Sequence, residues 1–208
     1  MKIIDMETYP RRSHFEYFGS LAYPYMGMSA NMDVTNILAR ARELGGSTFI
    51  ACLWAASRAL NSVPELRQRV IDGQIGEVDH CDAGHTVALS DGTFSSCRTD
   101  CRCDLPEFLK VAGAKHEAAK QRHGFNHEDD EINMFFVSCI PWASFTQVIQ
   151  PTPTPGDWFP RVVFGKFIRE GERTLMPLAI QCNHGLVDGF HVVQFYAAFE
   201  KINEELKR

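Results

Sequence analysis

The sequence predicts a single α/β domain in which helices and β-strands alternate along residues 1–208. The chain has 208 residues, of which 45% are hydrophobic and 23% are charged, so it can bury one sizeable core. Segments with the apolar spacing of helices alternate with β-prone runs. No internal repeat and no linker-like stretch separates them, so we expect one layered structure of helices on a sheet.

Four segments are expected to be helices, after an extended start of the chain. Residues 33–44 have apolar side chains on one face, with Gly45 able to end the helix. Residues 47–60 are apolar almost all round, which is typical of a buried helix. Residues 104–122 begin with an aspartate that can cap the helix. The last helix runs from about residue 188 to the end, with an apolar stripe at Val192, Phe195, Tyr196, Phe199, Ile202 and Leu206.

The strand signals are distributed between these helices. Residues 67–78 contain Asp72-Gly73 between two β-prone arms, which predicts a hairpin. Further strands are expected at residues 85–89, 133–142, 161–168 and 174–184. The proline-rich stretch between the second and third of these cannot pair inside a sheet, so it is expected to be a loop.

Composition excludes several functional classes. The net charge of −5 and the absence of a basic block argue against nucleic-acid binding. No apolar run approaches the ~20 residues of a membrane span, and the first dozen residues lack the apolar core of a secretory signal. We therefore expect a cytoplasmic protein that binds neither nucleic acid nor membrane.

The cysteines are expected to be free thiols rather than disulfides. Seven is an odd count, and no export signal accompanies it. Cys97, Cys101 and Cys103 are close in sequence, but their spacing does not match a two-pair zinc pattern, and His80 and Cys81 are distant along the chain. The sequence therefore predicts no metal site.

The most informative stretch is the end of the strand at residues 174–184. It is almost continuously apolar, as in a strand buried on both faces, and it ends at His184. Histidine suits proton transfer at neutral pH because its unperturbed pKa is ~6.5. Asp188 stands where the last helix begins and could cap it. A His and an Asp at this spacing also occur by chance, so spacing alone leaves catalysis and an ordinary turn both open.

Several longer motifs resemble one enzyme family in order and spacing. They are PRRSHFEYF (10–18), FSS (94–96), NMFFVSCIPWASFT (133–146), FGKF (164–167) and LMPLAIQCNHGLVDGFHV (175–192). Together they resemble the chloramphenicol acetyltransferase family, whose signature is two histidines, three variable residues and Asp-Gly. The signature is also similar to that of lipoyl acyltransferase cores. His184 is the second histidine, and Asn183 stands in place of the first.

The resemblance implies a two-layer sandwich in which helices cover a large mixed sheet, and it implies an acetyl-CoA-dependent O-acetyltransferase. His184 would be the general base for a hydroxyl of chloramphenicol. Ser138 would donate to the oxyanion, although its strand context alone indicates a small core residue. Asp188 would pair with Arg11 and brace the site; a direct Asp188–His184 triad is the alternative.

The resemblance also implies residues for the two substrates. Lys166 would meet a CoA phosphate, although a solvated strand-end lysine is equally consistent with the sequence. An acceptor pocket suited to a flat nitrophenyl ring would be lined by Tyr17, Phe18, Phe94, Phe125, Trp158 and Val163. Such aromatic residues are more often core than ligand contacts. The family also forms trimers with active sites between subunits, so a homotrimer is implied.

Three departures leave the natural acceptor open. Val163 stands where the family has a threonine, so a hydroxyl is lost. Phe167 replaces the usual tyrosine, and the loop 147–160 differs wholly from the family's sequence. A related acyltransferase with another alcohol or amine acceptor, or a non-catalytic binding protein of the same fold, therefore remains an alternative to chloramphenicol acetylation.

Overall fold

The structure is a computed structural model that describes residues 1–122, 124, 131–152 and 157–207. Its centre is a seven-stranded mixed sheet with the strand order β2-β10-β8-β7-β5-β6, to which β9 adds at the start of β10. The strands are β2 (Tyr25–Asp33), β5 (Asp82–Ala88), β6 (Phe94–Thr99), β7 (Met134–Ile140), β8 (Arg161–Gly165), β9 (Ile168–Glu170) and β10 (Arg173–Asn183).

The sheet is mixed because β5, β7 and β8 run parallel to one another while the other pairs are antiparallel. β10 is the longest strand and pairs with β2 along nine residues of each strand. It lies between β2 and β8, and its last residue, Asn183, marks where the chain leaves the sheet for the last helix.

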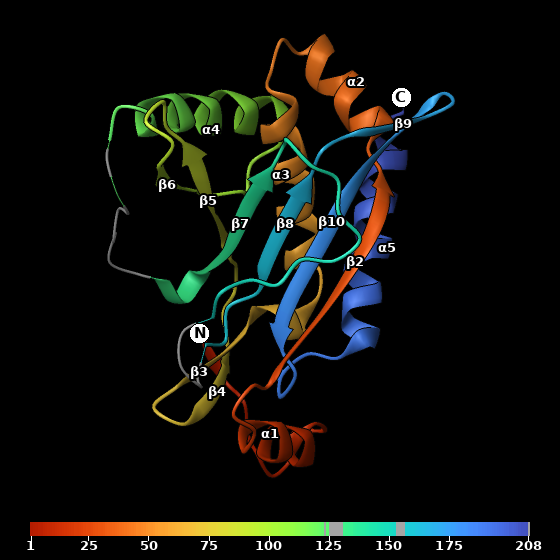
Figure 1. The fold of residues 1–208 in the computed structure, drawn as a ribbon. Helices are drawn as coiled ribbons and strands as arrows, with labels where there is room; N and C mark the ends of the chain where they lie inside the picture. Colours follow the sequence, from red (N-terminus) through yellow and green to blue (C-terminus); the bar gives the residue numbers. More distant parts are fainter. Residues whose placement is uncertain (123, 125–130, 153–156, 208) are drawn as a thin grey trace.

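The helices cover one face of the sheet, as Figure 1 shows. They are α2 (Thr35–Glu43), α3 (Thr48–Asn61), α4 (Leu105–Ala119) and α5 (Gly189–Glu205). Alternate side chains of the strands meet them in a continuous core, for example Phe164 of β8, Ile180 of β10 and Phe199 of α5, each no more than 1% exposed. This arrangement confirms the expected two-layer α/β sandwich.

On the opposite face of the sheet, the described residues form no helix. The chain between β7 and β8 crosses it in front of β8 and β10 (Figure 1). Gln150 in this segment holds it there, because its backbone N–H donates to the side chain of Gln181 and its carbonyl accepts from the same side chain, at 3.1 and 3.3 Å. This proline-containing segment forms no strand within its described residues, as expected.

A smaller sheet of β1 (Lys2–Ile3), β4 (Gln74–Glu77) and β3 (Gln68–Ile71) stands beside the main one. The predicted hairpin is present: Asp72 and Gly73 connect β3 to β4 with φ angles of 51° and 79°. Both values lie in the left-handed region, which a type I′ turn requires and which glycine adopts without strain.

Two expectations about local structure were wrong. The start of the chain is not extended throughout, since Arg12–Gly19 form helix α1. Helix α1 has eight residues and none of them is fully buried, so it lacks the long apolar stripe by which α5 can be recognised. The run 161–168 is not one strand either, because β8 ends at Gly165 and β9 begins at Ile168.

All seven cysteines are free, as expected. Among the helices of the described residues, none is long and apolar enough to span a membrane.

Candidate active site

The turn between β10 and α5 is set by the residues that end the strand and cap the helix. β10 ends at Asn183, the last residue paired with β2, and α5 begins at Gly189. Asp188 is the N-cap, and its carboxylate accepts from the backbone N–H of Phe190 at 3.0 Å. The side chain of His191 in turn accepts from the Asp188 N–H at 3.1 Å, which completes a capping box with histidine as its third residue.

His184 lies inside this turn and is held at both its backbone and its ring. Its backbone N–H donates to the carbonyl of Pro24 at 2.7 Å, and its Nδ1 lies 2.9 Å from the carbonyl oxygen of Val187. A carbonyl oxygen can only accept, so Nδ1 of the neutral ring carries the proton. Nε2 therefore keeps its lone pair and is the atom that can accept a proton from a substrate.

The ring of Phe18 covers one side of the His184 ring. The two centroids are 3.9 Å apart and the planes are inclined by 29°, which is a stacked arrangement. Tyr17 meets Phe18 edge-on but is itself exposed, and Trp158 packs against Phe15 with centroids 5.6 Å apart. Helix α1, which contributes Phe15, Tyr17 and Phe18, thus gives the His184 turn an aromatic wall.

Asp188 does not contact the His184 ring through any hydrogen bond in the described residues; it pairs with Arg11. The Arg11 guanidinium forms an ion pair with the Asp188 carboxylate and also donates to the carbonyl of His184 at 3.0 Å. Burial by itself would raise the pKa of Asp188, but attraction to His191 and Arg11 outweighs it, so the net effect lowers this pKa. The carboxylate stays ionised at neutral pH and braces the turn from the side of Arg11.

Asn183 is a contributor that sequence reasoning did not assign. Its side-chain oxygen accepts from the N–H of Gly185 at 2.9 Å, and its side-chain nitrogen donates to the carbonyl of Asp157 at 3.4 Å. The side chain is almost wholly buried, so these bonds have no competition from water. It therefore ties the His184 turn to the crossing segment. The sequence did mark Asn183, because it stands where the two-histidine signature has its first histidine.

Ser138 and Val163 form a second group on the helix-free face of the sheet. They are paired neighbours on β7 and β8, and both alternate with core residues that face the helices. Val163 is 1% exposed although it lies on this face, so the valine occupies a covered position where a hydroxyl would have been able to hydrogen-bond.

The two groups do not meet within one chain. Val163 pairs with Ala179 on β10, and His184 lies five residues further along that strand direction. At about 3.3 Å per residue and about 4.8 Å between strands, Ser138 and His184 are roughly 20 Å apart. A single chain therefore keeps His184 and Ser138 apart.

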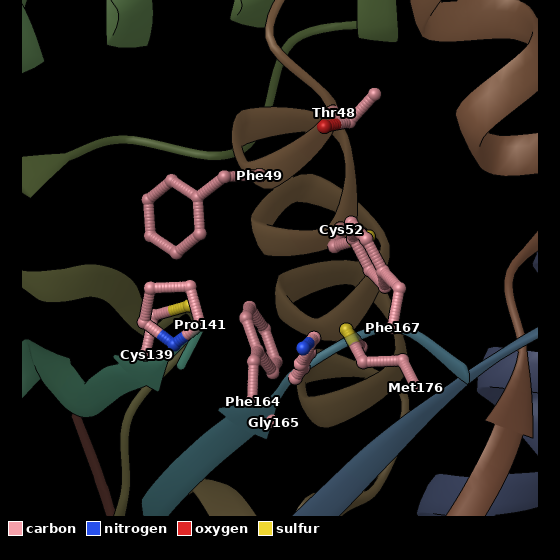
Figure 2. Close-up of a pocket in the computed structure, with 10 residues that line it drawn as sticks. Thr48, Phe49, Cys52, Cys139, Pro141, Phe164, Gly165, Phe167 and Met176 are labelled. Atoms are coloured by element: carbon pink, nitrogen blue, oxygen red, sulfur yellow. The ribbon is translucent and has the colours of Figure 1, made fainter. Parts of the chain in front are cut away.

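A pocket of about 380 Å³ opens at the end of β8, near the start of α3 (Figure 2). Its wall is mostly apolar and includes Phe49 of α3, Cys139 of β7 and Phe167 after β8. Lys166 adds the one lysine among the lining residues, and its backbone N–H is fixed by the carbonyl of Ala143 at 2.9 Å. A narrow apolar pocket with a cation at its side can take an acyl-pantetheine chain with a phosphate nearby.

Two of the residues expected to line the acceptor pocket remain, Phe94 and Phe125. Phe94 stands at the start of the edge strand β6 and is partly exposed. Phe125 lies outside the described residues. Besides Asn183, sequence reasoning missed the carbonyls of Val187 and Pro24, because backbone acceptors leave no residue-type signal.

Comparison with known proteins identifies the family. Residues 1–200 match the family described as chloramphenicol acetyltransferase. This chain belongs to that family. Chloramphenicol acetyltransferases of Clostridium perfringens and Proteus mirabilis are 31% and 30% identical to it; the first alignment covers 96% of both chains, and the second covers 91% of this chain and 88% of the relative.

Solved structures agree with the family assignment. A chloramphenicol acetyltransferase structure superposes with a TM-score of 0.85 at 26% identity, covering 96% of this chain and 98% of the other. The truncated catalytic core of the 2-oxoacid dehydrogenase complex from Thermoplasma acidophilum has a TM-score of 0.68 at 17% identity over both whole chains. The second likeness shows the shared fold alone.

The Arg11–Asp188 pair is predicted to act as one energetic unit. We expect Arg11→Met and Asp188→Asn each to lower the free energy of unfolding by about 1–2 kcal/mol, less than a fully buried pair because Asp188 is partly exposed. Asparagine keeps the helix cap, so the change isolates the charge. The double variant should cost little more than either single one, measured by urea unfolding.

Arg12→Met is the matched control, because Arg12 is exposed and pairs with Glu16 on the surface of α1. It should change stability by less than about 0.5 kcal/mol. Additive losses for Arg11 and Asp188 in the double variant would contradict the coupled pair.

Proposed function

We propose that this protein is an acetyl-CoA-dependent O-acetyltransferase that acetylates a hydroxyl of chloramphenicol and thereby confers resistance. The observation that carries the proposal is the hydrogen bond from His184 Nδ1 to the Val187 carbonyl, within a chain of this family. It leaves Nε2 free to accept the proton of an alcohol, which is otherwise a poor nucleophile at neutral pH.

In the proposed reaction, Nε2 of His184 takes the hydroxyl proton as the acceptor oxygen attacks the thioester carbonyl. The Ser138 hydroxyl donates a hydrogen bond to the oxyanion of the tetrahedral intermediate. Collapse of the intermediate breaks the carbon–sulfur bond, and the departing CoA thiolate takes the proton back from His184. Asp188 and Arg11 keep the turn in place without joining the proton transfer.

The separation of His184 from Ser138 supports a composite active site between subunits. The two residues are roughly 20 Å apart in one chain, so a single chain cannot place both the base and the oxyanion donor at the same intermediate. In a head-to-tail ring, each subunit offers His184 to the Ser138 of its neighbour. We therefore propose a homotrimer, as in the family that the sequence resembles.

The coenzyme is proposed to enter through the pocket at the end of β8. The pantetheine arm would lie along Phe49 and Phe167, with Lys166 beside a phosphate. Cys139 lines the pocket from the helix side of β7, whereas the next-door Ser138 faces the other side of the sheet, so the thioester end would have to pass the end of β7 to reach the oxyanion donor. Because acetyl-CoA is the co-substrate and chloramphenicol acts on ribosomes, the reaction is proposed to occur in the cytoplasm.

A second candidate function is transfer of an acyl group to a different alcohol or amine. Val163 favours it, because a buried valine beside Ser138 cannot hold the water that a threonine hydroxyl could bind near the oxyanion. Phe167 likewise offers the pocket no hydroxyl. The same assay run over a panel of acceptors separates the two candidates.

The enzymatic proposal is tested by CoA release. Purified protein with acetyl-CoA, chloramphenicol and a thiol reagent should release free CoA, and His184→Ala should lower the rate ~100- to 10,000-fold. Ser138→Ala should lower it by ~100-fold or more, because one oxyanion donor is lost. His14→Ala, an exposed histidine on α1, is the control and should be as active as the parent. Equal rates for the His184 variant and the parent would refute the proposal.

The coenzyme pocket makes a separate kinetic prediction. Lys166→Ala should raise KM for acetyl-CoA ~3- to 10-fold with little change in kcat, because the lost contact is made equally in the ground and transition states. Lys110→Ala, an exposed lysine on α4, should leave both constants unchanged. A fall in kcat with unchanged KM would place Lys166 at the reacting atoms instead.

A further inference from the structure

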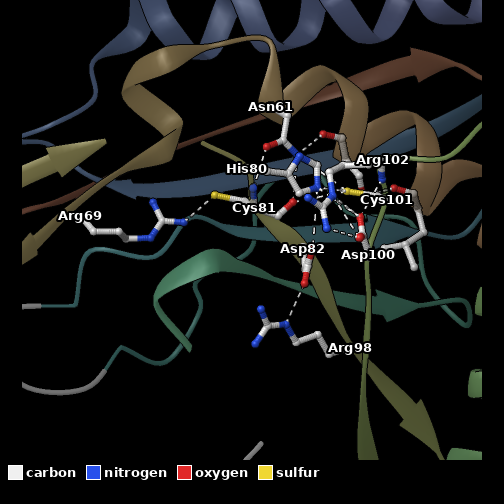
Figure 3. Close-up of polar contacts among 11 residues, drawn as sticks. Asn61, Arg69, His80, Cys81, Asp82, Arg98, Asp100, Cys101 and Arg102 are labelled. Atoms are coloured by element: carbon white, nitrogen blue, oxygen red, sulfur yellow. Dashed lines mark hydrogen bonds and ion pairs between the residues drawn. The ribbon is translucent and has the colours of Figure 1, made fainter. Parts of the chain in front are cut away.

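A cluster of polar side chains stands where β5 begins and β6 ends, away from the residues proposed for acetyl transfer (Figure 3). The antiparallel β5–β6 pair brings His80 and Asp82 beside Asp100, although the sequence separates them by about twenty residues. One ligand atom from each of these three residues lies within 4.8 Å of the other two. Their separation along the sequence argued against a metal site, but the pairing of β5 with β6 brings these residues together in space.

The distances from His80 to the two carboxylates are longer than hydrogen bonds. His80 Nε2 lies 3.6 Å from an Asp82 oxygen and 3.8 Å from an Asp100 oxygen. Both separations are too long for hydrogen bonds. Ligand atoms that share a tetrahedral Zn²⁺ ion at ~2.0–2.1 Å are ~3.3–3.5 Å from one another, so both distances from His80 lie within about half an ångström of ligand spacing.

The surrounding residues hold two of the ligands in place. Arg98 Nε donates to the other oxygen of Asp82 at 3.0 Å, which leaves the first oxygen directed to His80. The side chain of Asn61 clamps the peptide of Cys81, donating to its carbonyl and accepting from its N–H at 2.9 and 2.8 Å. Hydrogen-bonded carboxylates and a fixed backbone are the usual supports of a metal site.

Asp100 is held as well. Its Oδ1 accepts from the backbone N–H of Arg102 at 2.9 Å and from Arg102 Nε at 3.0 Å. Cys101 Sγ is 3.2 Å from His80 Nε2, and its buried thiol donates to the Cys81 carbonyl at 3.3 Å, so it is a neighbour and not a ligand.

We propose that His80, Asp82 and Asp100 form a binding site for a divalent first-row transition metal ion, with Zn²⁺ as the best fit. One imidazole nitrogen and two carboxylate oxygens supply three ligands, and water completes the tetrahedron. The ion would join the start of β5 to the end of β6 and so stabilise this corner of the sheet.

The test is calorimetric titration of the tag-free, EDTA-treated full chain with ZnCl2. We expect one site per chain and a rise in Tm with added Zn²⁺. His80→Ala and Asp100→Asn should each weaken binding at least ~10-fold and abolish the rise in Tm. Asp79→Asn, an exposed carboxylate next to the site, is the matched control and should bind as the parent does.

Asp100 is partly exposed, so its variant is expected to fold, and the Tm of each metal-free variant checks this directly. If His80→Ala and Asp100→Asn bind Zn²⁺ as strongly as the parent does, the ion lies elsewhere and the proposal is overturned. The absence of Zn²⁺ binding to the parent would overturn it as well. The acetyl-transfer rate of the metal-free protein is measured in parallel. It should be unchanged, so a failure of this site is distinguishable from a failure of the proposed function.

Discussion

The position of β8 between β7 and β10 determines how far Ser138 lies from His184 within one chain. Because β8 separates them, Ser138 and His184 stay roughly 20 Å apart in one chain, and no side-chain rotation can join them. The sheet is rigid, since β10 is paired along both edges and packed on α5 beneath. The proposed acetyl transfer would therefore need a neighbouring copy against the helix-free face, where Ser138 lies.

The second requirement is a turn that presents His184 in one tautomer. Four separate contacts define it: the Val187 carbonyl at Nδ1, the Pro24 carbonyl at the backbone N–H, the Phe18 ring on one side and Arg11 at the backbone carbonyl. None of the residues that supply them is itself a proton donor or acceptor in the reaction. The proposed catalytic base, His184, is thus positioned by ordinary secondary-structure contacts, and Asp188 contributes through the helix cap and through Arg11.

The sequence predicted the parts of the fold that have a periodic or capping signal. The buried helix α3, the Asp72-Gly73 hairpin and the apolar strand that became β10 were all expected. Helix α1 was missed because its eight residues give only a short apolar pattern, in which Phe15 and Phe18 are partly buried. The family resemblance named His184 and Ser138, but not that β8 lies between their strands. Contacts made by backbone carbonyls, and the meeting of His80 with Asp100, arise only from the pairing of strands and could not be predicted from residue types.

Mixing two inactive variants tests the composite site most directly. His184→Ala and Ser138→Ala chains are unfolded together in equal amounts, refolded and assayed for CoA release. If each site takes its base from one chain and its oxyanion donor from the next, about a quarter of all sites in the refolded trimers regain both groups, and about a quarter of the parent activity returns. Mixed protein that stays as inactive as either variant alone would contradict the account.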